Sequence, residues 1–95
     1  MTYTDLQQAI SILGLRERAT IQEIKKRHRE LVKHYHPDTG NNDDNEKIGE
    51  INSAYKLLYA YISAYQFSFT EQEFYKQNPE ERIRQQFMDV AQWRR

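Results

Sequence analysis

The chain has 95 residues, of which 14 are basic and 14 acidic, and it contains no cysteine. This length allows one domain with one modest hydrophobic core, and the absence of cysteine excludes disulfides and thiolate metal sites. Balanced charge argues against a general binder of nucleic acid. No apolar run approaches the ~20 residues of a membrane span and no signal-peptide pattern is present, so we expect a soluble, cytoplasmic chain without a membrane segment.

The first helix is predicted by an apolar face and by the residues at its ends. It should run from Asp5 to Leu13, with Thr4 or Asp5 as the N-cap and Gly14 as a left-handed stop. Apolar residues recur three and four positions apart, which is the spacing of one helix face. They are Leu6, Ala9, Ile10 and Leu13.

The second helix is predicted to open at Thr20, because Glu23 three positions later completes a capping-box pattern. It should end at about Tyr35, because Pro37 disfavours helical geometry at His36. One stripe of this helix carries Ile24, His28, Leu31, Val32 and Tyr35. A different face, called the basic face below, carries Lys25, Lys26, Arg29 and Lys33. Spacings of four residues allow two surface ion pairs, Glu23–Arg27 and Lys26–Glu30.

Turn-forming residues separate this helix from a third one. The stretch 39–45 has no apolar residue, which indicates a solvated loop. The third helix should run from Asp44 to about Tyr65, with apolar residues spaced by three and four. These are Ile48, Ile51, Tyr55, Leu58 and Ile62. Because a short loop joins two long helices, they should be antiparallel neighbours.

The last third of the chain also carries helix signals. Thr70 with Glu73 is a capping-box candidate for a short helix. Asn78 followed by Pro79 is typical of a helix start, and an apolar stripe then predicts a final helix that reaches Trp93. The stripe consists of Ile83, Phe87, Val90 and Ala91.

No segment alternates apolar and polar residues as a half-buried strand does, so the predicted fold class is all-α. The apolar faces of the first three helices should form the core. Its predicted members are Leu6, Ile10, Leu13, Ile24, Leu31, Val32, Tyr35, Ile48, Ile51, Tyr55 and Leu58.

The tripeptide His36-Pro37-Asp38 lies between the second and third helices, beside the basic face. Alone, it indicates a helix stop followed by a polar loop in which Asp38 bonds its own backbone. Together with residues 23–35 before it and 48–58 after it, the tripeptide resembles the J domain of DnaJ-type co-chaperones. The resemblance covers roughly residues 3 to 62.

This resemblance implies a J domain at residues 1–65, in which the second and third helices form an antiparallel hairpin. Beyond Ile62 the resemblance fades, and the helix signals of residues 66–95 predict a helical extension that packs on or beside this domain. The resemblance implies no catalysis by this chain itself. The expected activity is binding of a DnaK-type heat-shock chaperone and stimulation of its ATP hydrolysis, which aids protein folding or complex remodelling. The resemblance assigns triggering to His36, Pro37 and Asp38, and docking to Lys25, Lys26, Arg29 and Lys33.

The basic face has two interpretations. Exposed charges most often form an ordinary solvated helix face. Four like charges on one face repel one another without a partner, which favours a patch that steers onto an acidic surface. A third possibility, nucleic-acid binding through this helix, is disfavoured by balanced charge and by acidic residues at 43, 44, 46 and 50.

Some positions depart from the family pattern. Glu30 stands where a basic residue is common, His28 where tyrosine is common, and Thr39-Gly40 where a basic residue and asparagine are common. These departures suggest tuning to one particular chaperone. They also motivate the alternative function, a J-like protein-interaction scaffold that stimulates no ATPase.

No catalytic or metal site is predicted. His28 and His34 are six positions apart on one helix and point in different directions, so only His34 and His36 can converge, without an arranged carboxylate. The sequence has no nucleophile–base pair and no glycine-rich phosphate loop. We therefore expect a non-enzyme without a cofactor.

Aromatic residues are frequent in residues 65–93, and they too have two interpretations. They either pack back on the core of residues 1–65 or contact a second protein partner, and packing is the favoured interpretation. The ending Trp93-Arg94-Arg95 is abrupt, as expected of a piece of a longer protein. No sequence signal indicates an oligomeric state.

Overall fold

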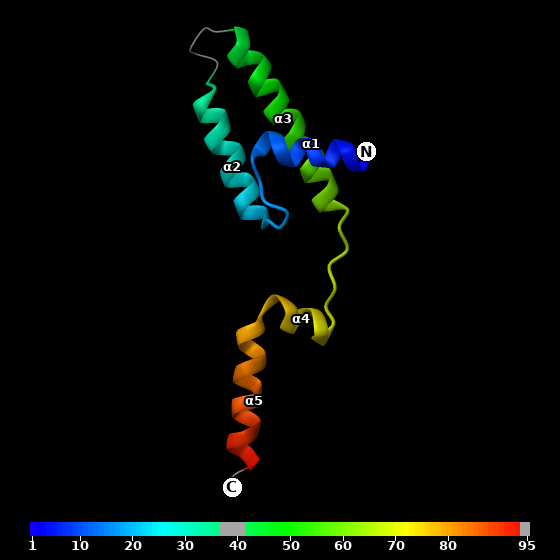
Figure 1. Ribbon diagram of the computed structural model, residues 1–95, viewed down its shortest axis with the longest axis vertical. Helices are drawn as coiled ribbons and strands as arrows, with labels where there is room; N and C mark the ends of the chain where they lie inside the picture. The colour runs from blue at the N-terminus through cyan, green and yellow to red at the C-terminus, as the bar shows by residue number, and fades with distance from the viewer. Residues whose placement is uncertain (37–41, 94–95) are drawn as a thin grey trace. The chain divides into compact units, whose positions relative to one another are not determined.

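The structure is a computed structural model that describes the backbone of residues 1–36 and 42–93 and the side chains of 1–36 and 45–90. Within these ranges every regular element is an α-helix (Figure 1), which confirms the predicted all-α class. In chain order the helices are α1 (Tyr3–Leu13), α2 (Ile21–His34), α3 (Asn42–Ser63), α4 (Glu71–Gln77) and α5 (Pro79–Trp93). The chain divides into two compact units, Met1–Tyr65 and Gln66–Arg95.

In the first unit α2 and α3 lie side by side and antiparallel, and α1 packs across α3 and also contacts α2 (Figure 1). The predicted helical hairpin is therefore confirmed. Because three helices meet here, each apolar stripe has a neighbouring helix to pack against.

The core of this unit lies where the three helices meet. Its buried residues are Ala9, Leu13, Ile24, Ile51, Ala54 and Leu58. Most other predicted core residues are partly buried against this cluster, namely Leu6, Ile10, Leu31, Val32, Tyr35 and Tyr55. Ile48 is half-buried at the edge. The two alanines were not predicted as core members; they lie on α1 and α3, where short side chains let packed helices approach closely.

The start of α1 differs from the prediction. Its N-cap is Thr2, not Thr4 or Asp5, and the helix already begins at Tyr3. The Thr2 hydroxyl accepts a hydrogen bond from the backbone N–H of Asp5 at 3.1 Å, and the Asp5 carboxylate accepts one from the N–H of Thr2 at 3.0 Å. Asp5 thus fills the third position of a capping box, a role that the sequence pattern assigns to glutamate or glutamine.

The start of α3 also lies earlier than predicted. The third helix was predicted to begin at Asp44, after a solvated loop, but α3 begins at Asn42. Acidic residue types are favourable in a first helical turn, and positions 43 and 44 are both aspartate. The apolar pattern begins only at Ile48, so it marks where α3 packs rather than where it begins.

The second unit consists of α4 packed against α5. Thr70 caps α4, as predicted, by accepting a hydrogen bond from the N–H of Glu73 at 3.3 Å. Asn78 lies between α4 and α5 and is the C-cap of α4. Its side-chain amide donates a hydrogen bond to the carbonyl of Phe74 at 3.0 Å. The Arg82 guanidinium lies over the ring of Tyr75, 5.5 Å from its centre. Packing of this unit on residues 1–65 stays a prediction.

Candidate functional site

The candidate site begins with α2, whose start is fixed by Thr20. The Thr20 hydroxyl accepts a hydrogen bond from the N–H of Glu23 at 3.1 Å, and the same hydroxyl lies 3.2 Å from the Glu23 carboxylate. This confirms the predicted N-cap, although Glu23 contacts the hydroxyl of Thr20 and not its backbone N–H. With the helix start fixed, Ile24 is buried against the core.

The basic face lies away from this core. All four of its side chains are exposed: Lys25, Lys26, Arg29 and Lys33. None of them makes an ion pair with any part of the chain that the structure describes. The predicted pairs Glu23–Arg27 and Lys26–Glu30 are wrong, because Glu30 instead contacts Arg27 at 3.4 Å. Lys26 therefore remains available to a partner along with the other three cations.

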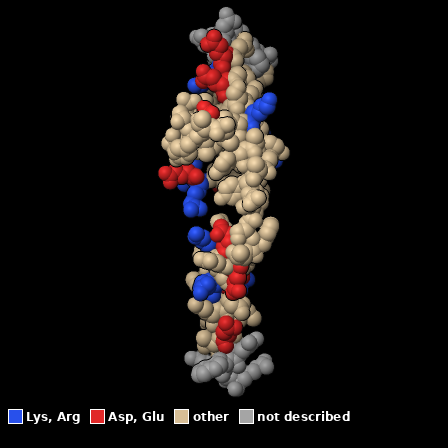
Figure 2. Space-filling view, turned by 90° about the vertical axis from the view of Figure 1, so that its right-hand side faces the viewer, with Lys and Arg blue, Asp and Glu red and all other residues tan. Residues whose placement is uncertain are grey.

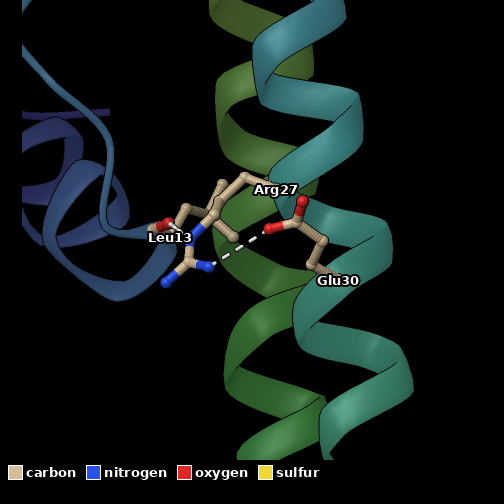
Figure 3. Close-up of polar contacts among 3 residues, drawn as sticks. All are labelled: Leu13, Arg27 and Glu30. Atoms are coloured by element: carbon tan, nitrogen blue, oxygen red, sulfur yellow. Dashed lines mark hydrogen bonds and ion pairs between the residues drawn. The ribbon is translucent and has the colours of Figure 1, made fainter.

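Arg27 is the basic residue of α2 that faces the rest of the fold (Figure 3). Its Nε donates a hydrogen bond to the carbonyl of Leu13 at 2.8 Å, in a partly buried position. This carbonyl belongs to the last turn of α1, where the helix leaves acceptors unpaired. A cation at a helix C-terminus is also favoured by the helix dipole. Arg27 thus joins the end of α1 to the middle of α2.

Gly14 makes this contact possible. Its φ of 65° lies in the left-handed region, as predicted for a helix stop. The N–H groups of Gly14 and Leu15 donate to the carbonyls of Ser11 and Ile10, which closes the end of α1. A Cβ atom added at Gly14 would lie 3.2 Å from the guanidinium of Arg27. The backbone conformation therefore favours glycine at this position, and a larger residue would in addition force Arg27 to shift.

His28 connects α2 to α3. Its ring stacks on Tyr55, with ring centres 4.0 Å apart and planes 13° from parallel. Its Nε2 also lies at hydrogen-bond distance, 2.9 Å, from the side-chain oxygen of Asn52. His28 therefore belongs to the contact that holds the hairpin together, on the side of α2 where the apolar stripe was predicted.

The predicted triggering residues follow α2 directly. The helix ends at His34 with Tyr35 as its C-cap, which confirms the predicted end. His36 comes next and is exposed. Pro37 and Asp38 lie outside the described residues. The basic face therefore lies along α2, and His36 follows directly after the C-terminal end of the same helix.

The described residues also bear on metal binding and on membrane insertion. In these parts of the chain, no three His, Cys, Asp or Glu side chains are grouped so that they could hold a metal ion. No helix among these residues is long and apolar enough to cross a lipid bilayer.

Two contributors to the site were missed by sequence reasoning. Asn52 could not be predicted, since its contact depends on how α2 and α3 pack. The inward position of Arg27 could have been predicted, because helical spacing places it beside the apolar stripe and not among the four exposed cations.

Comparison with known proteins gives a consistent result. The family model described as DnaJ domain matches residues 9–62. The chaperone protein DnaJ of Carboxydothermus hydrogenoformans is 51% identical over 49 residues, which is 50% of this chain and 13% of that protein. The chaperone protein DnaJ of Finegoldia magna is 44% identical over 55 residues, 56% of this chain and 15% of that protein. For the chaperone protein DnaJ 2 of Synechocystis, identity is 49% over 49 residues, 50% of this chain and 16% of that protein.

The matched region thus spans about one seventh of the length of these curated relatives. No solved structure matches this chain.

Proposed function

Because this chain belongs to the DnaJ domain family, we propose that it acts as a J-domain co-chaperone. It binds a DnaK-type chaperone, and its His36-Pro37-Asp38 sequence stimulates hydrolysis of the ATP that the chaperone holds. The chain itself contributes no catalytic group and needs no cofactor, and its place of action is the cytoplasm. This proposal rests on the family match and on the layout of α2.

The single observation that carries the docking role is the exposed basic face. Four cations lie on one side of α2 without ion-pair partners among the described residues, and the same helix leads directly to His36. Lys25, Lys26, Arg29 and Lys33 are therefore proposed to contact an acidic surface of the chaperone.

Electrostatics sets the kind of effect to expect. Each exposed ion pair contributes only about 0.2–1 kcal/mol, so four such contacts give modest affinity. Their larger effect is on the association rate, because a patch of one sign steers an oppositely charged partner. Salt should weaken this effect, since the Debye length falls from about 10 Å at 0.1 M to about 3 Å at 1 M.

The testing experiment is single-turnover ATP hydrolysis by the DnaK-type chaperone of the same organism, measured with increasing concentrations of this chain. His36→Gln should abolish stimulation at every concentration of the chain. Lys26→Glu combined with Arg29→Glu should instead raise the concentration needed by about tenfold at low salt. The gap between this double variant and the wild type should close as salt is added.

Lys56→Glu is the matched control, because Lys56 is an exposed lysine of α3 outside the basic face. Its stimulation should equal that of the wild type. If Lys56→Glu weakens stimulation as much as a reversal on α2, the basic face has no special role. If the folded wild type stimulates none of the organism's DnaK-type chaperones, the scaffold function replaces this proposal.

A further inference from the structure

A shallow groove lies on the first unit, between α1 and α3. Its volume is about 330 Å³, and apolar side chains from both helices line it. These are Ala9 and Ile12 from α1, and Ala54 and Leu57 from α3. An apolar groove between two helices is one kind of surface that receives the apolar face of an amphipathic helix. No residue of the basic face lines the groove.

Gly49 lines the same groove and has no evident role within the chain. It lies in the interior of α3, where glycine is a poorer helix former than alanine. Its φ is not positive, and an added Cβ would meet no atom within 4 Å. Neither the backbone nor internal crowding therefore requires glycine here. Glycine does serve where another backbone must approach closely, and the open side of Gly49 faces such a space.

The charges at the groove all have one sign. Asp5 of α1 and Glu50 of α3 contribute carboxylates, and the lining contains no lysine, arginine or histidine. Glu50 lies 3.8 Å from Lys47, yet its side chain remains 58% exposed. Figure 2 shows acidic side chains over the N-terminal half of α3, next to uncharged surface. An occupant of complementary chemistry would be apolar at its centre and basic at its edges.

We propose that this groove binds a helical segment of a second protein, whose small and apolar side chains lie against Gly49 and whose flanking lysine or arginine residues contact Asp5 and Glu50. The site is formed by α1 and α3, whereas the proposed chaperone contact uses α2 and His36. The chain would thus hold a basic helix on one face and a chaperone on another. This inference goes beyond the proposed function and can fail without affecting it.

The test uses the full chain and a synthetic helical peptide with an alanine- and leucine-rich face flanked by lysines. Binding is followed by backbone amide NMR shifts. Saturable shifts confined to α1 and α3 are expected, and a peptide with glutamate in place of each lysine should not bind. Gly49→Ala should weaken binding about fivefold, and Gly49→Leu by about thirtyfold or more, because each fills the space that the peptide needs.

The effect of Gly49→Ala on stability serves as a control for this test. Gly49→Ala should raise the melting temperature by about 4 °C while it weakens binding, because alanine favours the helix. Weaker binding therefore cannot be explained by unfolding. Ser63→Ala, at the exposed end of α3 and outside the groove, should leave peptide binding unchanged. Stimulation of the chaperone's ATPase by Gly49→Ala should equal that of the wild type.

Several outcomes would overturn the proposal. Among them are no saturable shifts, shifts centred on α2, or equal binding of the glutamate peptide. Groove shifts that depend on the concentration of the chain alone would identify a second copy as the occupant. If Gly49→Leu shifted the amides of residues 66–90 in the absence of peptide, the occupant would be the chain's own second unit. Unchanged affinity in Gly49→Leu would remove the role of Gly49.

Discussion

Among the described side chains, six residues from three helices are buried in Met1–Tyr65, whereas none is buried in Gln66–Arg95. Both units nevertheless carry helical apolar stripes. Leu13 of α1 is 0% exposed, while Ile83 and Phe87 of α5 are 70% and 77% exposed. A helical period therefore indicates which side of a helix is apolar, but burial needs further helices that cross that side. Three crossing helices provide such cover in the first unit.

The largest test of this contrast removes one apolar side chain from each unit. Leu13→Ala should cost about 3 kcal/mol of unfolding free energy, since the side chain is fully buried. Ile83→Ala should change it by less than about 0.5 kcal/mol. Urea unfolding followed by circular dichroism measures both. A large loss in Ile83→Ala would show that the stripe of α5 is covered, and the contrast between the units would disappear.

Removing the link between α1 and α2 should have the next largest effect. Arg27→Leu leaves the carbonyl of Leu13 without its 2.8 Å partner, which should cost about 1.5–2 kcal/mol. Arg29→Leu is the matched control, because Arg29 is exposed on the same helix. Thermal unfolding compares the two variants. Equal losses would mean that the link adds nothing beyond the helix propensity of arginine.

The N-cap threonines of α2 and α4 compare the two units through a smaller change in stability. Thr20→Ala should lower the stability of the first unit by about 1 kcal/mol, because α2 unfolds together with the core. Thr70→Ala removes the equivalent cap of α4, yet it should only increase local fraying. Amide hydrogen exchange distinguishes these results. Slow, cooperative exchange throughout α4 that Thr70→Ala abolishes would contradict the expectation of local fraying only.

The smallest effect concerns pH. The hydrogen bond from the backbone N–H of Thr2, with a second from its side chain, lowers the pKa of Asp5 from its ordinary value of 3.8. Since the folded pKa is depressed, ionised Asp5 stabilises the fold above pH 3.8, and this contribution is lost as the pH falls through the lowered pKa. Asp5→Asn should therefore flatten the loss of α1 helicity below pH 4. An unchanged acid profile would contradict this assignment.

Helix ends were predictable where a residue type itself marks the end. Gly14, Thr20 and Thr70 act as the patterns indicate. The starts of α1 at Tyr3 and of α3 at Asn42 were missed, because the expected starts were placed closer to the first apolar residues than the helices actually begin.

The site was predictable only in part. The exposure of the basic face follows from helical spacing, which fixes the directions of neighbouring side chains. The contacts of Arg27 with Leu13, and of His28 with Tyr55, join residues 14 and 27 positions apart along the chain. They depend on crossing angles between helices, which no local pattern contains. The same holds for the groove beside Gly49.

The close approach of Arg27 to Gly14 has an evolutionary consequence. A left-handed helix stop ordinarily accepts asparagine as well as glycine. Here a Cβ at position 14 would also lie 3.2 Å from the guanidinium of Arg27, so the arginine would have to shift. The two positions should therefore vary together among relatives: asparagine at position 14 should be more frequent where position 27 carries a shorter residue, and arginine at 27 should most often be accompanied by glycine at 14.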